Sequence, residues 1–283
     1  MSLLQLAIIA LLQGTTEWLP VSSSGHVLLA AGFFEASPGD ELLINAVSNL
    51  GTLLAMLIYF RKDVTSAIAG GFELVAAPIS KSPLSKGARL AAAVIVATPV
   101  AVLVAFAYEK FLPESMLESM RSIYVVAATT IIFGALLWWA DVKGARDRRE
   151  EDMTMWHAFL IGATQAIAAI LPGTSRSGIT MTAARAFGYD RTEAARFSML
   201  IGAPILAAAG LYGAMGLVTA DATETVLTLK DGLIVASIAF ITGLASIWFL
   251  MSLLSRMSFL PFVLYRFALG AVLILGSPLV GLL

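Results

Sequence analysis

Six apolar stretches in this chain are each long enough to cross a lipid bilayer, which takes a helix of about 20 residues. They cover residues 42–60, 89–108, 121–140, 194–216, 232–254 and 262–282. Charged residues make up only 13% of the 283 residues, where soluble domains carry about 25%. This shortage of charged residues excludes a soluble enzyme and a disordered chain. The net charge is −1 and no basic tract occurs, which excludes a nucleic-acid-binding protein. The sequence therefore predicts an all-α, polytopic integral membrane protein.

Two further apolar regions, residues 2–34 and 156–188, are interrupted in the middle by polar residues. The first interruption lies within Gln13 to His26 and the second within Leu171 to Thr180. The apolar arms on either side are about 10–16 residues long, too short to span singly. Non-helical backbone at membrane depth is tolerated only where protein or a watery cavity surrounds it. We therefore expect each region to be a re-entrant hairpin, in which a polar break joins two helices. Because no Lys or Arg precedes Arg61, we expect no cleavable signal peptide.

The two interrupted regions are similar to each other. A shift of 152 residues places Gln13 on Gln165, and it also places Ser22 on Thr174. The most polar stretch of the chain follows residue 140 and separates the two copies. The similarity predicts two repeats, each with one re-entrant hairpin and three transmembrane helices.

The predicted organisation is a single membrane domain over residues 1–283. It comprises a first repeat at 1–140, a cytoplasmic linker at 141–152 and a second repeat at 153–283. Because three transmembrane helices is an odd number, the second repeat must enter the membrane from the opposite side. We therefore expect inverted-topology repeats, whose polar breaks meet near the middle of the bilayer.

The distribution of basic residues predicts the orientation. If the 61–88 loop is cytoplasmic, 13 basic residues lie on that side and three lie outside, a strong positive-inside bias. The cytoplasmic set is Arg61, Lys62, Lys81, Lys86, Arg89, Lys143, Arg146, Arg148, Arg149, Arg185, Arg191, Arg196 and Arg256. The outside set is Lys110, Arg121 and Lys230. Both termini are then outside, and the first hairpin enters from the outer face.

Two basic residues remain within the apolar regions. Arg266 lies near the start of the last apolar stretch, and we expect its long side chain to extend to the cytoplasmic interface. Arg176 lies in the second break, where an intramembrane arginine indicates a functional site. Glu17, the only acidic residue deep in an apolar segment, lies four residues after Gln13 and therefore on the same helix face. A Glu17–Arg176 ion pair that merely joins the hairpins is the structural alternative.

The polar residues of the two breaks suit phosphate chemistry. In the second break, Gly173, Thr174, Ser175 and Ser177 surround Arg176 ahead of a half-helix whose amides can hold an anion. In the first break, Ser23 offers a hydroxyl nucleophile, and His26 is near enough on the helix to exchange a proton with it. The hydroxyls of Ser22 and Ser24, adjacent to Ser23, join the candidate substrate-binding set.

A carboxylate beside a phosphate site needs a cation or a proton. Glu17 and Gln13 offer oxygen ligands of the kind that Mg²⁺ or Ca²⁺ accepts together with substrate phosphate. We therefore expect a divalent cation at these two residues.

At these motifs the sequence resembles the bacterial undecaprenyl-pyrophosphate phosphatases, also known as bacitracin-resistance proteins. The family's Glu/Gln-x-x-x-Glu and Pro-Val-Ser-Ser-x-Gly-His pattern is matched by Gln13, Glu17 and Pro20 to His26. Its Pro-Gly-x-Ser-Arg-Ser-x-x-Thr pattern is matched by Pro172 to Thr180. A closing run from Ser255 to Phe267 also fits, so the resemblance covers nearly the whole chain.

The resemblance implies hydrolysis of undecaprenyl pyrophosphate to undecaprenyl phosphate and phosphate, which recycles the lipid carrier for peptidoglycan synthesis and confers bacitracin resistance. It implies a multi-pass protein of the bacterial plasma membrane, dependent on a divalent cation, with its site open to the periplasm. By motif, the resemblance implies catalytic positions at Glu17, Ser23, His26 and Arg176. It also implies that the pyrophosphate is surrounded by Gln13, Ser22, Ser175, Ser177 and Thr180. Many members have a glutamate where this chain has Gln13, which leaves Glu17 as the better metal candidate.

Several questions stay open from the sequence. Either Ser23 attacks the phosphorus, with His26 or Glu17 moving the proton, or these residues activate a water directly. A lipid or anion carrier is the rival function, because secondary transporters are also built from inverted repeats, and fold analogy does not separate the two. The partner is a polyprenyl diphosphate lipid within the bilayer. The sequence leaves the oligomeric state open, a homodimer included.

Overall fold

The chain folds into a bundle of α-helices. The computed structural model describes residues 2–34, 38–80, 83–219 and 228–276. The helices are α1 (Leu3–Thr16), α2 (Ser23–Phe33), α3 (Pro38–Tyr59), α4 (Arg61–Ser80), α5 (Lys86–Ala97), α6 (Pro99–Phe111), α7 (Glu114–Met120), α8 (Ile123–Lys143), α9 (Met155–Ala163), α10 (Gln165–Ile170), α11 (Arg176–Ala186), α12 (Arg191–Thr219), α13 (Leu229–Leu254) and α14 (Leu260–Gly276). A single 3₁₀ turn, Glu150–Asp152, precedes α9. The prediction of an all-α protein is confirmed over these ranges.

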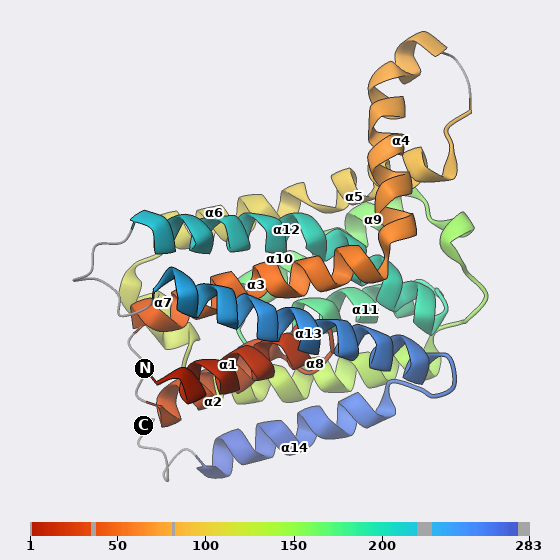
Figure 1. Ribbon diagram of the computed structural model, residues 1–283. Coiled ribbons are helices and arrows are strands. Elements are labelled where there is room, and N and C mark those ends of the chain that lie inside the picture. The colour runs from red at the N-terminus through yellow and green to blue at the C-terminus, as the bar shows by residue number, and fades with distance from the viewer. Residues whose placement is uncertain (1, 35–37, 81–82, 220–227, 277–283) are drawn as a thin grey trace.

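Most of the helices run side by side along one direction, with α4 projecting from one end (Figure 1). Among the described residues, four segments could cross a membrane by length and composition: Lys86–Tyr108 (α5 with α6), α8, Arg191–Leu211 within α12, and α13. The first predicted span corresponds to α3, which meets that test only as a pair with α4. The last corresponds to α14, a shorter apolar helix whose predicted extension beyond residue 276 lies outside the described residues. The apolar helices make this an integral membrane protein.

The predicted 61–88 loop is wrong in its first part, because Arg61–Ser80 forms helix α4. The chain bends by 90° between α3 and α4. Along α4, Ile68, Phe72 and Val75 are exposed at helical spacing, whereas Gly70 packs against Gly87 of α5. The segment was predicted as a loop because it begins with charged and polar residues, although its apolar residues have the spacing of an amphipathic helix.

Both interrupted regions are pairs of helices joined by a non-helical break, as predicted. In the first, residues 17–22 separate α1 from α2. In the second, residues 171–175 separate α10 from α11, and α10 follows α9 with a kink at Thr164. The short half-helices therefore end inside the bundle, where the breaks face each other.

The two ends of the bundle carry different charges. The basic end, where α3, α8, α11 and α13 terminate, holds Arg61, Arg89, Lys143, Arg191 and Arg256. The opposite end, where α1 begins and α14 terminates, holds Lys110, Arg121 and Lys230. This arrangement groups the basic residues as the predicted orientation requires.

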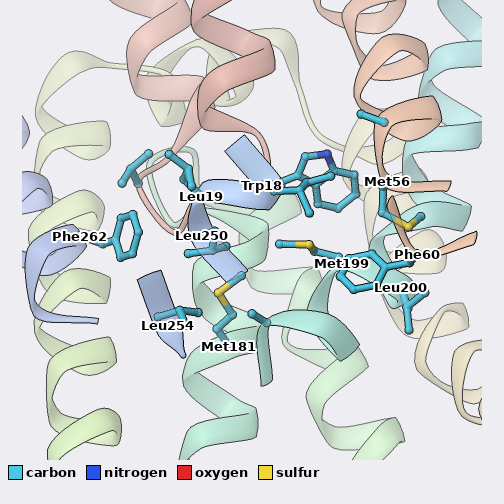
Figure 2. Packing of buried hydrophobic residues seen from close by; sticks show 14 of the residues in the cluster. Trp18, Leu19, Met56, Phe60, Met181, Met199, Leu200, Leu250, Leu254 and Phe262 are labelled. Atoms are coloured by element: carbon cyan, nitrogen blue, oxygen red, sulfur yellow. The ribbon is translucent and has the colours of Figure 1, made fainter. Parts of the chain in front are cut away.

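A cluster of buried apolar side chains fills the bundle between the breaks and the basic end (Figure 2). Trp18 and Leu19 come from the first break and Met181 from α11. The other labelled members lie near the basic ends of α3, α12, α13 and α14: Met56, Phe60, Met199, Leu200, Leu250, Leu254 and Phe262. Because the cluster is closely packed and apolar, it separates the breaks from that end of the molecule.

Candidate active site

The two breaks meet and start two half-helices at the same place. Ser22 (φ 72°) directly precedes α2, and Ser175 (φ 67°) directly precedes α11. Both serines therefore hold a left-handed conformation that is uncommon outside glycine. The predicted alignment paired Ser22 with Thr174, but the residue that shares the backbone conformation of Ser22 is Ser175. The alignment is off by one residue because the second break has one more residue between its proline and this serine. The amino ends of two helices, which favour anions, thus converge on the breaks.

Glu17 accepts hydrogen bonds from three side chains. The Ser23 hydroxyl donates to Oε2 over 2.8 Å. Gln13 Nε2 donates to the same oxygen over 3.0 Å, and Arg176 Nη2 donates to Oε1 over 3.1 Å. The structure therefore brings together four residues that were predicted from two distant motifs. Gln13 Nε2 also lies 3.2 Å from Oδ1 of Asn49, a residue of α3 that the sequence interpretation missed.

Arg176 lies between the carboxylate and an aromatic ring. Its ion pair with Glu17 is largely buried, with side-chain exposures of 13% and 9%. The guanidinium carbon lies 5.0 Å from the centre of the Trp18 ring, within the range of a cation–π contact. Nη1 is buried and has no hydrogen-bond partner in the described chain. A buried charged donor without a partner is costly.

The serines of the two breaks tie the hairpins to each other. The Ser24 hydroxyl accepts a hydrogen bond from the Gly173 amide over 3.2 Å. The buried Ser177 hydroxyl donates to the Leu19 carbonyl over 3.0 Å. Ser175 caps α11 by accepting from the Gly178 amide. Ser24 is exposed, Ser23 and Ser175 are half-buried, and Ser22 and Ser177 are buried, so the first three are the serines that a substrate can reach.

Two of the predicted binding hydroxyls are buried and are not hydrogen-bonded to Glu17. The Thr180 hydroxyl is buried and lies 2.6 Å from the hydroxyl of Ser198 on α12. The Thr174 hydroxyl is also buried, without a hydrogen-bond partner among the described residues. Thr180 therefore joins α11 to α12, which shapes the site from outside it.

Both ring nitrogens of His26 are engaged, and neither contacts Ser23. Nδ1 lies 2.7 Å from the Ser22 carbonyl oxygen, so Nδ1 must carry the proton, because a carbonyl only accepts. Nε2 lies 2.6 Å from the Tyr265 hydroxyl, and the two rings stack with centroids 5.6 Å apart. In neutral His26 the Tyr265 hydroxyl therefore donates to Nε2. The expected His26–Ser23 proton exchange is not seen in this arrangement, and Tyr265 was missed.

Arg266 is fully buried, so the expected extension to the interface is wrong. Its guanidinium donates to carbonyls of both breaks, reaching Pro20 from Nη1 over 3.3 Å and Gly173 from Nη2 over 3.1 Å. It also donates to the carbonyls of Thr129, Thr130 and Thr174. These carbonyls replace water, which is why the side chain points inward. The position of Arg266 near the start of an apolar stretch was the sequence feature that could have indicated a buried arginine with polar partners.

The residues present fit a divalent cation held jointly with phosphate. Gln13 Oε1 is buried without a hydrogen-bond partner among the described residues, and it lies on the residue that contacts Glu17. The described part of the chain contains no group of three or more His, Cys, Asp or Glu side chains suited to a metal ion. One carboxylate and one amide oxygen bind Mg²⁺ or Ca²⁺ weakly, so a cation at these residues would need further oxygen ligands.

Comparison with known proteins identifies the family. The sequence pattern of the family described as bacitracin resistance protein BacA matches residues 6–272. An undecaprenyl-diphosphatase of Hyphomonas neptunium is 64% identical over 280 residues, covering 99% of this chain and 98% of that protein. Undecaprenyl-diphosphatases of Maricaulis maris and Jannaschia sp. are 43% and 41% identical, each covering 97% of this chain and 98% of the relative. With matching motifs in both breaks and similarity along its whole length, this chain belongs to the bacitracin resistance protein BacA family.

Proposed function

We propose that this protein is an undecaprenyl-diphosphatase, which hydrolyses undecaprenyl diphosphate to undecaprenyl phosphate and inorganic phosphate. The observation that carries the proposal is the Glu17 carboxylate, which contacts both a candidate nucleophile, Ser23, and a guanidinium, Arg176. A carrier has to bind and release its cargo, and it does not need a hydroxyl paired with a base. The names of the relatives agree with this enzyme class. The reaction recycles the lipid carrier on which envelope polymers are built.

The substrate diphosphate is placed between the amino ends of α2 and α11. There the helix ends and Arg176 provide positive charge where negative charge develops during phosphoryl transfer. Nη1 of Arg176 has no partner in the described chain, so a phosphate oxygen would satisfy it. The exposed side chains of Ser24 and Tyr265 mark the approach to this site.

Ser23 is the proposed nucleophile and Glu17 the proposed base. The Ser23 hydroxyl already donates its proton toward Glu17 Oε2 over 2.8 Å, the geometry that general-base catalysis needs. The Ser23 oxygen forms a bond to the terminal phosphorus, the bridging P–O bond breaks, and undecaprenyl phosphate leaves. Water then attacks phosphoserine, releasing phosphate and regenerating the hydroxyl. His26 is engaged with Ser22 and Tyr265, so its proposed role is to orient the Tyr265 hydroxyl beside the site.

Gln13 and Glu17 would hold a divalent cation together with substrate phosphates. When bound, such an ion supplies charge neutralisation at the phosphoryl oxygens. The buried, unpartnered Oε1 of Gln13 supports this assignment.

We also propose that the two hairpins belong to inverted-topology repeats and that the site opens toward the periplasm. The positive-φ serine ahead of each inner half-helix supports the repeat. The apolar cluster that separates the breaks from the basic end supports an opening toward the opposite end. Because basic loops stay in the cytoplasm, that opposite end faces outward.

The test is release of inorganic phosphate from a polyprenyl diphosphate by the purified protein, with and without a chelator. We expect hydrolysis that stops with the chelator and returns when Mg²⁺ or Ca²⁺ is added. A Ser23→Ala variant should lose turnover, and phosphoserine at position 23 should be trapped by acid quenching of the wild type. Absence of hydrolysis by the wild type would contradict the enzyme assignment. Turnover by Ser23→Ala at the wild-type rate would favour direct attack by water.

A further inference from the structure

Arg176 makes an unusually close approach to helix α12. A Cβ atom built at Gly202 would lie 1.6 Å from Arg176 Nη1, 2.6 Å from Cζ and 3.1 Å from Nη2. These are the three nearest heavy atoms, and all belong to one guanidinium group. The guanidinium therefore occupies the volume that any other residue at position 202 would fill with its side chain.

The other contacts of Arg176 define the same position from different sides. Glu17 holds Nη2 over 3.1 Å, and the Trp18 ring lies 5.0 Å from Cζ. Nη1, the atom closest to the Gly202 position, is buried. A side chain at position 202 would push the guanidinium out of its place between the carboxylate and the ring.

Gly202 differs in this respect from glycines that serve helix packing. A Cβ at Gly51 would lie 2.2 Å from the backbone oxygen of Ala236, and one at Gly162 would lie 2.2 Å from the backbone oxygen of Ala97. Those contacts could be relieved only by moving whole helices apart. The contact at Gly202 is relieved by moving the end of one flexible side chain. A substitution at Gly202 therefore displaces the Arg176 guanidinium and leaves the packing of the helices unchanged.

We propose that Gly202 is a positioning residue for phosphoryl transfer. Because glycine has no side chain, it leaves the space that the Arg176 guanidinium occupies. The proposal deepens the proposed function and rests on it for its kinetic readout. It also accounts for a glycine in the interior of α12, two residues before Pro204, where glycine weakens a helix.

The first test is the Gly202→Ala variant, purified and assayed for hydrolysis of a polyprenyl diphosphate. We expect kcat/KM to fall roughly 100-fold, the loss that follows when a positioned group is displaced by about 1 Å. We expect the thermal melting temperature in detergent to stay at the wild-type value. The matched control is Gly71→Ala in α4, because a Cβ there meets nothing within 4 Å. That control should keep both wild-type activity and wild-type stability.

A second measurement separates positioning from packing. In the Arg176→Lys background, which keeps a charge but lacks the guanidinium, adding Gly202→Ala should cause no further loss of activity. In protein labelled with 5-fluorotryptophan, Gly202→Ala should shift the ¹⁹F resonance of Trp18, assigned with Trp18→Phe, because the guanidinium leaves the ring. Three outcomes would overturn the proposal: unchanged kcat/KM, an equal loss in the Arg176→Lys background, or an unmoved Trp18 resonance.

The same design distinguishes failure of this proposal from failure of the proposed function. If the wild-type protein hydrolyses no polyprenyl diphosphate, the proposed function fails. The Trp18 resonance and the melting temperature still report whether Gly202 seats Arg176. If the wild type hydrolyses the substrate and the Trp18 resonance of Gly202→Ala is unmoved, only the positioning role is wrong.

Discussion

At the scale of single residues, the site depends on how one carboxylate is surrounded. Glu17 has an arginine on one oxygen, and a serine and a glutamine on the other. Hydrogen bonds to an ionised group are shorter and stronger than neutral ones, so these three partners hold the side chain of Glu17 in one position. The ion pair that the sequence offered as a structural alternative is present. It shares its carboxylate with Ser23, however, so pairing and catalysis are compatible.

Arg176→Ala should abolish turnover while the protein stays folded and inserted. Loss of a group that stabilises developing charge costs roughly 10²–10³ in kcat, and Glu17 also loses its partner. Phosphate release from polyprenyl diphosphate measures the effect, with Arg176→Lys as the matched variant that retains part of the activity. Near-normal hydrolysis by the alanine variant would overturn the role of Arg176.

Tyr265→Phe should lower kcat about tenfold, part of the roughly 10²–10⁴ that positioned acid–base groups supply. The change removes only the hydroxyl 2.6 Å from His26 Nε2 and keeps the stacked ring. Steady-state kinetics should show the loss in kcat with KM little changed. Tyr124→Phe, at an exposed tyrosine of α8, is the control. Equal activities for both variants would remove Tyr265 from the site.

At the scale of elements, the break between α10 and α11 depends on Gly173. This glycine has φ +86°, and a Cβ there would lie 2.4 Å from the backbone oxygen of Val126 in α8. Gly173→Ala should therefore destabilise the protein by about 1–3 kcal/mol, the usual cost of such a strained residue. Thermal unfolding in detergent measures this loss beside Gly71→Ala. Stability equal to the wild type would show that the break tolerates a side chain.

The sequence predicted the elements whose signal is local and failed where the contact is distant. Proline, glycine and serine inside apolar regions located both breaks, and the motif spacing found Glu17, Ser23 and Arg176. Helix α4 was missed because its apolar residues recur only every three or four positions and fall short of a spanning segment. Tyr265 and Arg266 lie more than 230 residues from the first break, so only folding reveals that they contact it.

At the scale of the whole molecule, the two ends of the bundle should lie on opposite sides of the membrane. The chain contains no cysteine, so single cysteines report position without background. Lys230→Cys should react with a membrane-impermeant maleimide in intact spheroplasts, and Asp147→Cys should react only after the membrane is opened. Neither substitution weakens the predicted charge bias. The reverse labelling pattern would invert the proposed orientation and place the site toward the cytoplasm.

The buried guanidinium of Arg266 has a consequence for biogenesis. This side chain hydrogen-bonds five backbone carbonyls spread over both breaks and α8, and it follows all of them in the chain. Translation therefore delivers both hairpins to the bilayer before the group that bridges them exists. Until α14 inserts, those carbonyls must be satisfied by water or by other partners. The contacts by which Arg266 joins the two breaks therefore form only after α14 has been synthesised.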